Sequence, residues 1–225
     1  MYGLWVLLLL IFLSALPALA VLIWIRVRRF PITERPFGLP WFLLALLGGA
    51  LSLGIAAILQ AQFPPVNETT IAALLFKIFI QVALTEELGR FGVFVLLLGL
   101  VRRFGKKDQR STPAFDAVTG LIAGLGFAVI ETAMYGVGNF SIALVRAVTA
   151  APLHGACGTR VGMAVSRLRD APGIALVRFL YAVLIHGMYN FMIISPVVHL
   201  VFPILIAVTA LLSSLQLIRY SGERS

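Results

Sequence analysis

Cysteine and charged residues are scarce in this chain, and acidic residues are scarcer than basic ones. Cys157 is the only cysteine among 225 residues, which excludes an internal disulfide and a cysteine-rich zinc site. Charged residues make up 12% of the chain and hydrophobic residues 60%, against about 25% and about 45–50% in soluble domains. A soluble fold would expose too much apolar surface, and disordered chains lack such residues. The composition therefore indicates a polytopic membrane protein.

The basic residues lie in short clusters between long apolar runs, with 18 Lys+Arg against 9 Asp+Glu. Clusters of this kind are typical of cytoplasmic loops and not of a nucleic-acid surface. The sequence predicts an all-α fold, with a single integral membrane domain over residues 1–225 and about seven transmembrane helices. With seven crossings every basic linker and the C-terminus lie on one side, and the loops on the other side contain no Lys or Arg, so we expect the N-terminus outside and the C-terminus inside. The predicted spans are residues 3–25, 39–62, 71–101, 114–138, 140–165, 173–194 and 197–218.

The first predicted span has one feature of a secretory signal. Ala18-Leu19-Ala20 resembles a cleavage site, but no basic segment precedes it and the apolar run continues to Ile25. We therefore expect an uncleaved span. The chain shows no internal repeat and no separate soluble domain, so we expect its function to lie within or beside the bilayer.

Ionisable side chains occur near the middle of four consecutive predicted spans, within residues 71–195. Such groups cost at least ~2.5–3.5 kcal/mol each at mid-bilayer and indicate function by default. Their shared depth predicts that the four helices bring them into one site, which makes residues 71–195 the predicted catalytic helix core. The residues concerned are Glu86, Glu87, Glu131, His154 and His186.

Spacing on the helices adds detail to this predicted site. Arg90 lies within one turn of both Glu86 and Glu87, so it can pair with one carboxylate and leave the other for acid–base chemistry. A purely structural ion pair would leave the second carboxylate uncompensated. His186 and Asn190 share one helical face.

This set of side chains favours hydrolysis by activated water. Two imidazoles and one carboxylate are a common ligand set for catalytic zinc, and a further carboxylate can act as general base. Glu and His without a metal remain an alternative. Cys157 is interpreted as a packing residue, no serine lies in a nucleophile motif, and Asp108, Asp116 and Asp170 lie at the inner edge, unlike an aspartyl dyad.

Four short motifs in order resemble the PrsW-type intramembrane proteases. This family lies within the larger group of type II CAAX prenyl proteases and bacterial CPBP proteins. The resemblance covers about residues 75–195, and the first two spans match in hydropathy only. The chain departs from the family at Arg90, where PrsW proteins often carry Lys, and at Thr132, where they often carry Asn. The motifs are Glu86-Glu87-x-x-Arg90, Gly126-Phe127-Ala128-x-x-Glu131 with Tyr135, Arg146-Ala147 leading to His154 and Gly162, and His186-x-x-x-Asn190.

The resemblance implies a membrane-embedded metalloprotease, with zinc as the expected metal, that cleaves membrane-anchored proteins. PrsW itself is associated with cleavage of an anti-sigma factor, so an anti-sigma-factor-like substrate in a bacterial-type plasma membrane is expected. It also implies roles for residues. Glu86 and Glu87 supply the base and a charge partner, Asn190 stabilises an oxyanion, and the metal or activated water is held by Glu131, His154 and His186.

Other functions remain open at this point. CAAX-type proteases carry His where this chain has Glu131, which favours a PrsW-like peptidase over a CAAX-like one. Buried Glu and His also form proton relays in transporters, although the broken, inverted repeats of many transporters are not seen. A non-catalytic scaffold is the third possibility. Arg146 and Arg160 are interpreted as charges near the membrane surfaces, although Arg146 could instead contact a substrate.

Overall fold

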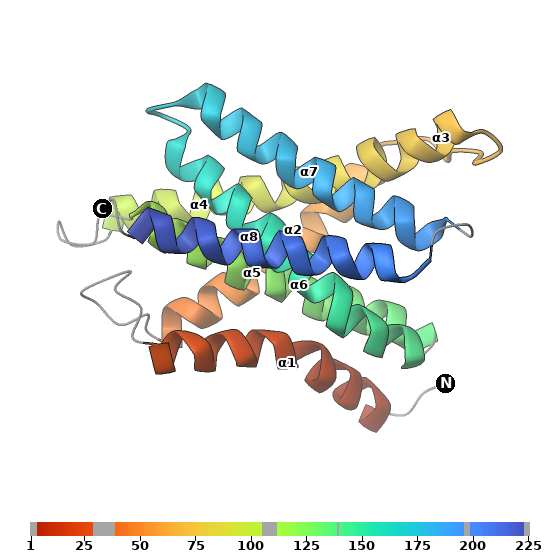
Figure 1. The fold of residues 1–225 in the computed structure, drawn as a ribbon, viewed down its shortest axis with the longest axis horizontal. Helices are drawn as coiled ribbons and strands as arrows, with labels where there is room; N and C mark the ends of the chain where they lie inside the picture. Colours follow the sequence, from red (N-terminus) through yellow and green to blue (C-terminus); the bar gives the residue numbers. More distant parts are fainter. Residues whose placement is uncertain (1–3, 29–38, 105–111, 139, 196–198, 223–225) are drawn as a thin grey trace.

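The computed structural model describes residues 4–28, 39–104, 112–138, 140–195 and 199–222. All regular structure in these ranges is helical, which confirms the predicted all-α fold. The helices run side by side along the long axis of the molecule, with α5 and α6 near the centre of the view (Figure 1). They are α1 (Leu4–Arg28), α2 (Leu39–Gln60), α3 (Ile71–Phe76), η1 (Lys77–Leu84), α4 (Thr85–Phe104), α5 (Pro113–Gly138), α6 (Phe140–Arg167), α7 (Pro172–Ile194) and α8 (Val201–Gly222).

Four of the described helices are long and apolar enough to cross a membrane. Two further predicted spans, residues 71–101 and 140–165, contain the charged side chains of Glu86, Glu87 and Arg146, which lower their mean hydropathy. Residues 29–38 and 105–111, which belong to two predicted basic linkers, lie outside the described residues. The four apolar helices cover Leu39–Gln60, Pro113–Val137, Pro172–Ile194 and Val201–Ser221.

The third predicted span changes its helical geometry before it reaches the acidic pair. The Thr70 hydroxyl caps α3 by accepting a hydrogen bond from the Ala73 amide, and α3 continues into the π-helix η1. A π-helix has a wider turn than an α-helix and is frequent at functional sites. It ends at Leu84, so the α-helical α4 opens with Thr85 and Glu86.

Glycines allow α5 and α6 to pack with their backbones in close approach. A Cβ atom added to Gly124 would lie 2.0 Å from the His154 carbonyl oxygen. A Cβ atom added to Gly120 would lie 2.1 Å from the Gly158 carbonyl oxygen. Small residues permit this approach between membrane helices. The contact at Gly124 fixes the backbone of His154 against α5.

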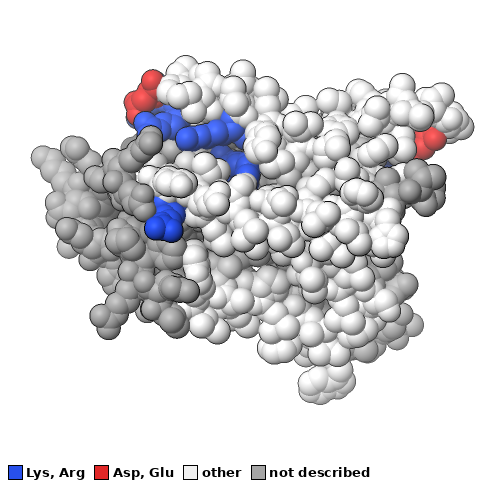
Figure 2. All heavy atoms as spheres, viewed as in Figure 1, with Lys and Arg blue, Asp and Glu red and all other residues white. Residues whose placement is uncertain are grey.

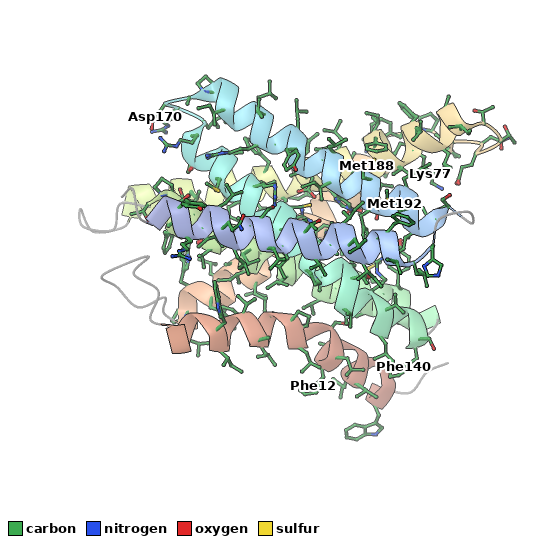
Figure 3. The ribbon with its side chains drawn as sticks, in the orientation of Figure 1. Phe12, Lys77, Phe140, Asp170, Met188 and Met192 are labelled. Atoms are coloured by element: carbon green, nitrogen blue, oxygen red, sulfur yellow. The ribbon has the colours of Figure 1, made fainter. Side chains whose placement is uncertain are left out.

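Charge lies toward the ends of the bundle on the face that Figure 2 shows. Lys and Arg gather toward the end where α6 joins α7 and α8 finishes, and most of the remaining surface is uncharged (Figure 2). Asp170 lies at this end and Lys77 near the opposite one (Figure 3). The described helices thus present a broad apolar surface between two charged ends, as expected of a protein embedded in lipid.

Candidate active site and metal centre

Four neighbouring elements bring the predicted polar residues together inside the bundle. Helix α4 supplies Glu86, Glu87 and Arg90 from its first two turns, and α5, α6 and α7 supply one acidic or imidazole residue each. The Glu86, Glu87, Arg90, His154 and His186 side chains are all buried. These side chains and Glu131 are connected by hydrogen bonds and ion pairs, so they form one site.

Glu87 is the structural anchor of this site. Arg90 Nη1 donates to both Glu87 carboxylate oxygens at 2.5 Å, and both side chains are fully buried. The Glu87 Oε1 oxygen also lies 2.8 Å from His186 Nδ1. Because a carboxylate accepts hydrogen bonds, this contact places the imidazole proton on Nδ1 and leaves a lone pair on Nε2. Arg90 therefore pairs with one carboxylate of the acidic pair, and this carboxylate orients His186.

Glu86 faces the interior of the site. Its Oε2 oxygen lies 3.5 Å from His186 Nε2 and has no hydrogen-bond partner within the described chain. Its other oxygen, Oε1, accepts a hydrogen bond of 3.4 Å from Gln60 Nε2 at the end of α2. Glu86, His154 and His186 can each point a ligand atom to a common centre, because these atoms lie within 4.8 Å of one another.

His154 is held between two charged groups. Its Nε2 lies 2.7 Å from Glu131 Oε2, and its Nδ1 lies 3.3 Å from Arg90 Nη2. An arginine only donates and a carboxylate accepts, so the ring proton lies on Nε2 in this arrangement. The Glu131 Oε2 oxygen also pairs with Arg146 Nη2 at 2.5 Å. Arg146 is therefore joined to His154 through Glu131.

Aromatic rings pack around the two imidazoles. The centroid of the Phe127 ring lies 4.9 Å from that of His154, and the Arg90 guanidinium lies over the same phenyl ring at 4.5 Å. The His154 and His186 rings meet edge to face at 4.9 Å. The Arg146 guanidinium stacks on Tyr135 at 4.1 Å. These rings restrict the rotation of the polar side chains that they contact.

All the predicted site residues lie in described helices, but they do not all share one set of contacts. Glu86, His154 and His186 form the possible metal cluster, whereas Glu131 contacts His154 and Arg146. Asn190 is half-buried one turn beyond His186. The resemblance assigned Glu131 to the metal and the acidic pair to the base and its partner. That division of roles stays a prediction, and the geometry of Glu86 gives a second arrangement to test.

Sequence reasoning missed Gln60 and the pairing of Arg146 with Glu131. Gln60 lies near the end of the predicted span 39–62 and has no motif around it, so no pattern in the sequence indicated its contact with Glu86. Arg146 did carry a signal, because it lies two helical turns before His154 on the same helix. Its proximity to Glu131 depends on how α5 packs against α6.

The family comparison agrees with this geometry. A family model described as PrsW family intramembrane metalloprotease matches residues 38–214, more than half of the chain. The chain belongs to the PrsW family of intramembrane metalloproteases. No curated protein and no solved structure matches it significantly. This PrsW-family chain is therefore a protease, and its family implies a metal.

The side chains of this PrsW-family protease fit such a metal. Two imidazoles and a carboxylate are a familiar ligand set for a catalytic metal ion with an open coordination position. Glu86 Oε2 is buried without a hydrogen-bond partner in the described part of the chain, which is costly unless a cation or a donor satisfies it. His186 Nε2 has its lone pair available, and its Nδ1–H is bonded to a carboxylate, as is usual for metal-ligating histidines.

Proposed function

We propose that this PrsW-family protease is an intramembrane endopeptidase that hydrolyses a membrane-anchored protein with water activated between α4, α5, α6 and α7. The observation that carries this proposal is the meeting of His154, His186 and Glu86 with a second carboxylate, Glu131, hydrogen-bonded beside them. A hydrolase of this type needs three ligands and a separate base, and the site contains four such groups.

We assign Glu86, His154 and His186 as the metal ligands and zinc as the metal. His154 would bind through Nδ1, which requires Arg90 Nη2 to leave that nitrogen, while its Nε2–H stays bonded to Glu131. Zinc binds imidazole nitrogen and carboxylate oxygen well and tolerates a site with three protein ligands. When bound, it would supply the positive charge that activates a water molecule and polarises the scissile carbonyl. Glu87 keeps His186 oriented, and Arg90 neutralises Glu87 in surroundings where a lone carboxylate would be costly.

The remaining polar residues carry out proton transfer and charge stabilisation. Glu131 is the proposed general base: it takes a proton from the attacking water and delivers it to the leaving amine nitrogen as the C–N bond breaks. Arg146 holds Glu131 in place for this step. The Asn190 amide would donate a hydrogen bond to the carbonyl oxygen as negative charge develops there.

The finer topology and the substrate belong to the same proposal. We propose seven crossings with the N-terminus outside and the C-terminus inside, in a bacterial-type plasma membrane. The gathering of basic side chains at the α6–α7 connection supports this orientation (Figure 2). The proposed substrate is an anti-sigma-factor-like protein with a membrane anchor, which rests on the resemblance of the motifs to PrsW.

Metal content separates the two arrangements of ligands. Purified wild type, Glu86→Gln, Glu131→Gln and His186→Ala proteins are analysed for bound zinc after equilibration with a zinc buffer. We expect Glu86→Gln and His186→Ala to lose zinc and Glu131→Gln to retain it while losing activity. If Glu131→Gln instead loses zinc and Glu86→Gln retains it, Glu131 is the metal ligand.

Cleavage in cells tests the activity itself. The protease is co-expressed with a single-span membrane protein that carries tags on both sides of the membrane, and fragments are detected by immunoblotting. We expect cleavage by wild type and none by His186→Ala at an equal protein level. Cleavage of the same substrate by both proteins would contradict the proposed site.

A further inference from the structure

We infer that Gln60 is a positioning residue of the active site, which holds the Glu86 carboxylate so that only one oxygen faces the imidazoles. This inference rests on the proposed function, in which Glu86 is a metal ligand. Gln60 is the last residue of α2 and is half-buried. Its side-chain amide donates to Glu86 Oε1 at 3.4 Å, while Glu86 Oε2 is the oxygen near His186.

Helix packing directs Gln60 toward α4. Ser52, Ala56 and Gln60 follow one another at intervals of four residues, so they lie on one face of α2. A Cβ atom on Gly89 of α4 would lie 2.7 Å from the Ser52 carbonyl oxygen and 3.1 Å from the Ala56 amide nitrogen. The backbones of α2 and α4 are therefore in close contact, and Glu86 lies one helical turn before Gly89. Gln60 meets Glu86 because these two helices are fixed against each other at Gly89.

A second glutamine fixes the chain that follows Gln60. The buried Gln81 side chain of η1 donates to the Pro64 carbonyl oxygen at 3.0 Å. Pro64 lies in the segment between α2 and α3, so this bond attaches the end of α2 to the helix that leads into Glu86. Gln81 lies within η1, whose wide turns end just before Thr85, and it faces this segment while Glu86 faces the site. Gln60 is thus positioned both by the packing of α2 on α4 and by the bond that attaches the following segment to η1.

The chemistry of the contact indicates what it does. An ionised carboxylate only accepts hydrogen bonds, so Gln60 must present its NH₂ group to Glu86. That bond occupies Oε1 and limits rotation of the carboxylate about its last torsion, which is otherwise broad. Hydrogen bonds of this kind orient ligating carboxylates, and their loss typically lowers metal affinity or activity by roughly 10- to 100-fold. At 3.4 Å the contact is long, so we expect an effect near the lower of these values.

Zinc affinity and steady-state kinetics of the purified full-length protein test this inference. Gln60→Met keeps the length of the side chain and removes its amide. Zinc affinity is measured in detergent by competition with a chromophoric chelator, and kcat and KM are measured with a transmembrane peptide. We expect roughly tenfold weaker zinc binding or a roughly tenfold lower kcat, with KM and the melting temperature unchanged. Gln60→Asn, which keeps the amide but is one methylene shorter, should behave in the same way and serves if the methionine variant folds poorly.

Gln62→Met is the matched control. Gln62 lies in the turn that follows α2 and is exposed, and its side-chain amide donates to the Ile58 carbonyl oxygen of α2 at 3.1 Å. Its replacement should leave zinc affinity and kcat unchanged. The role of Gln60 would be overturned if both Gln60 variants had the zinc affinity and kcat of wild type. It would also be overturned if the Gln62 control lost as much zinc affinity or kcat as the Gln60 variants. Failure of the wild type itself to bind zinc would instead contradict the proposed metal function.

Discussion

At the residue scale, the site is a set of buried charges that depend on their partners. Glu87 is balanced by Arg90 and bonded to His186, and Glu131 is balanced by Arg146 and bonded to His154. Each imidazole thus has a carboxylate as partner, and each of these carboxylates has an arginine. Removing one member of a buried pair leaves the other without compensation in a medium of low dielectric constant.

Loss of Arg90 should destabilise the whole protein. Arg90→Gln leaves the Glu87 carboxylate buried with only His186 as a partner, so we expect a loss of about 3–5 kcal/mol in the free energy of unfolding. The measurement is equilibrium unfolding in mixed detergent micelles. Arg169→Gln is the control, because Arg169 is exposed. Equal stability of the two variants would show that the Arg90–Glu87 pair does not support the fold.

Loss of Arg146 should affect catalysis more than stability, because Glu131 is only partly buried and keeps its hydrogen bond to His154. Arg146→Gln removes the ion pair that orients Glu131, so kcat should fall by roughly 10- to 100-fold, and Arg146→Lys should restore part of it. The control is Lys77→Gln, because the Lys77–Glu68 ion pair is exposed and exposed pairs contribute little. If Arg146→Gln changes KM alone, Arg146 contacts substrate and does not position Glu131.

At the scale of helices, close backbone contacts decide where the side chains meet. The approach at Gly124 fixes His154, and the approach at Gly89 aligns α2 with α4. Arg160 connects α6 to α8. Its side chain is buried between these helices and donates hydrogen bonds to the Ser213 and Ser214 hydroxyls, and its predicted place near a membrane surface stays a prediction. Helix association in lipid depends on such packing and polar contacts, since apolar surface alone gives little driving force.

Two glycine-to-alanine substitutions should have opposite effects. Gly124→Ala places a methyl group 2.0 Å from the His154 carbonyl oxygen, so α5 and α6 must separate, and both stability and zinc binding should fall. Gly92→Ala meets nothing within 4 Å and should stabilise α4 by about 0.4–1 kcal/mol. Melting temperatures and zinc content of both variants test this contrast. A Gly124→Ala protein that matches wild type in both would show that α5 and α6 can separate without cost to the site.

At the scale of the whole molecule, the charged ends and the apolar surface between them define the placement in a membrane. Lys77 and Asp170 lie at opposite ends of the bundle (Figure 3). The proposed orientation puts Glu68, near Lys77, outside and Asp170 inside. The single cysteine, Cys157, is fully buried. The chain is therefore suited to topology mapping with introduced cysteines.

Cysteine labelling of intact cells should show this orientation. In a Cys157→Ala background, a membrane-impermeant maleimide should label Glu68→Cys in intact cells. It should label Asp170→Cys only after the membrane is permeabilised. Unchanged Cys157 protein serves as the unlabelled control. The reverse pattern would show that the N-terminus faces inward.

Much of the site was predictable from the sequence because charged residues within apolar spans have few explanations. The side chains of Glu86, Glu87, His154 and His186 were identified by their depth alone, and Arg90 by its position one turn away. Their pairing was not predictable. Helical periodicity shows that both Glu86 and Glu87 can reach Arg90, but it does not show that Arg90 contacts Glu87 or that Glu131 contacts Arg146. Those contacts depend on the rotation of each helix about its own axis.

The sequence by itself determined an all-helical protein with a broad apolar surface and a cluster of acidic and imidazole groups, because apolar content and helical spacing are properties of local sequence. Only the tertiary structure decided which carboxylate faces both imidazoles, and it brought in Gln60 from a helix with no recognisable motif. The physical reason is that contacts between helices depend on where small residues let the backbones approach, as at Gly89 and Gly124.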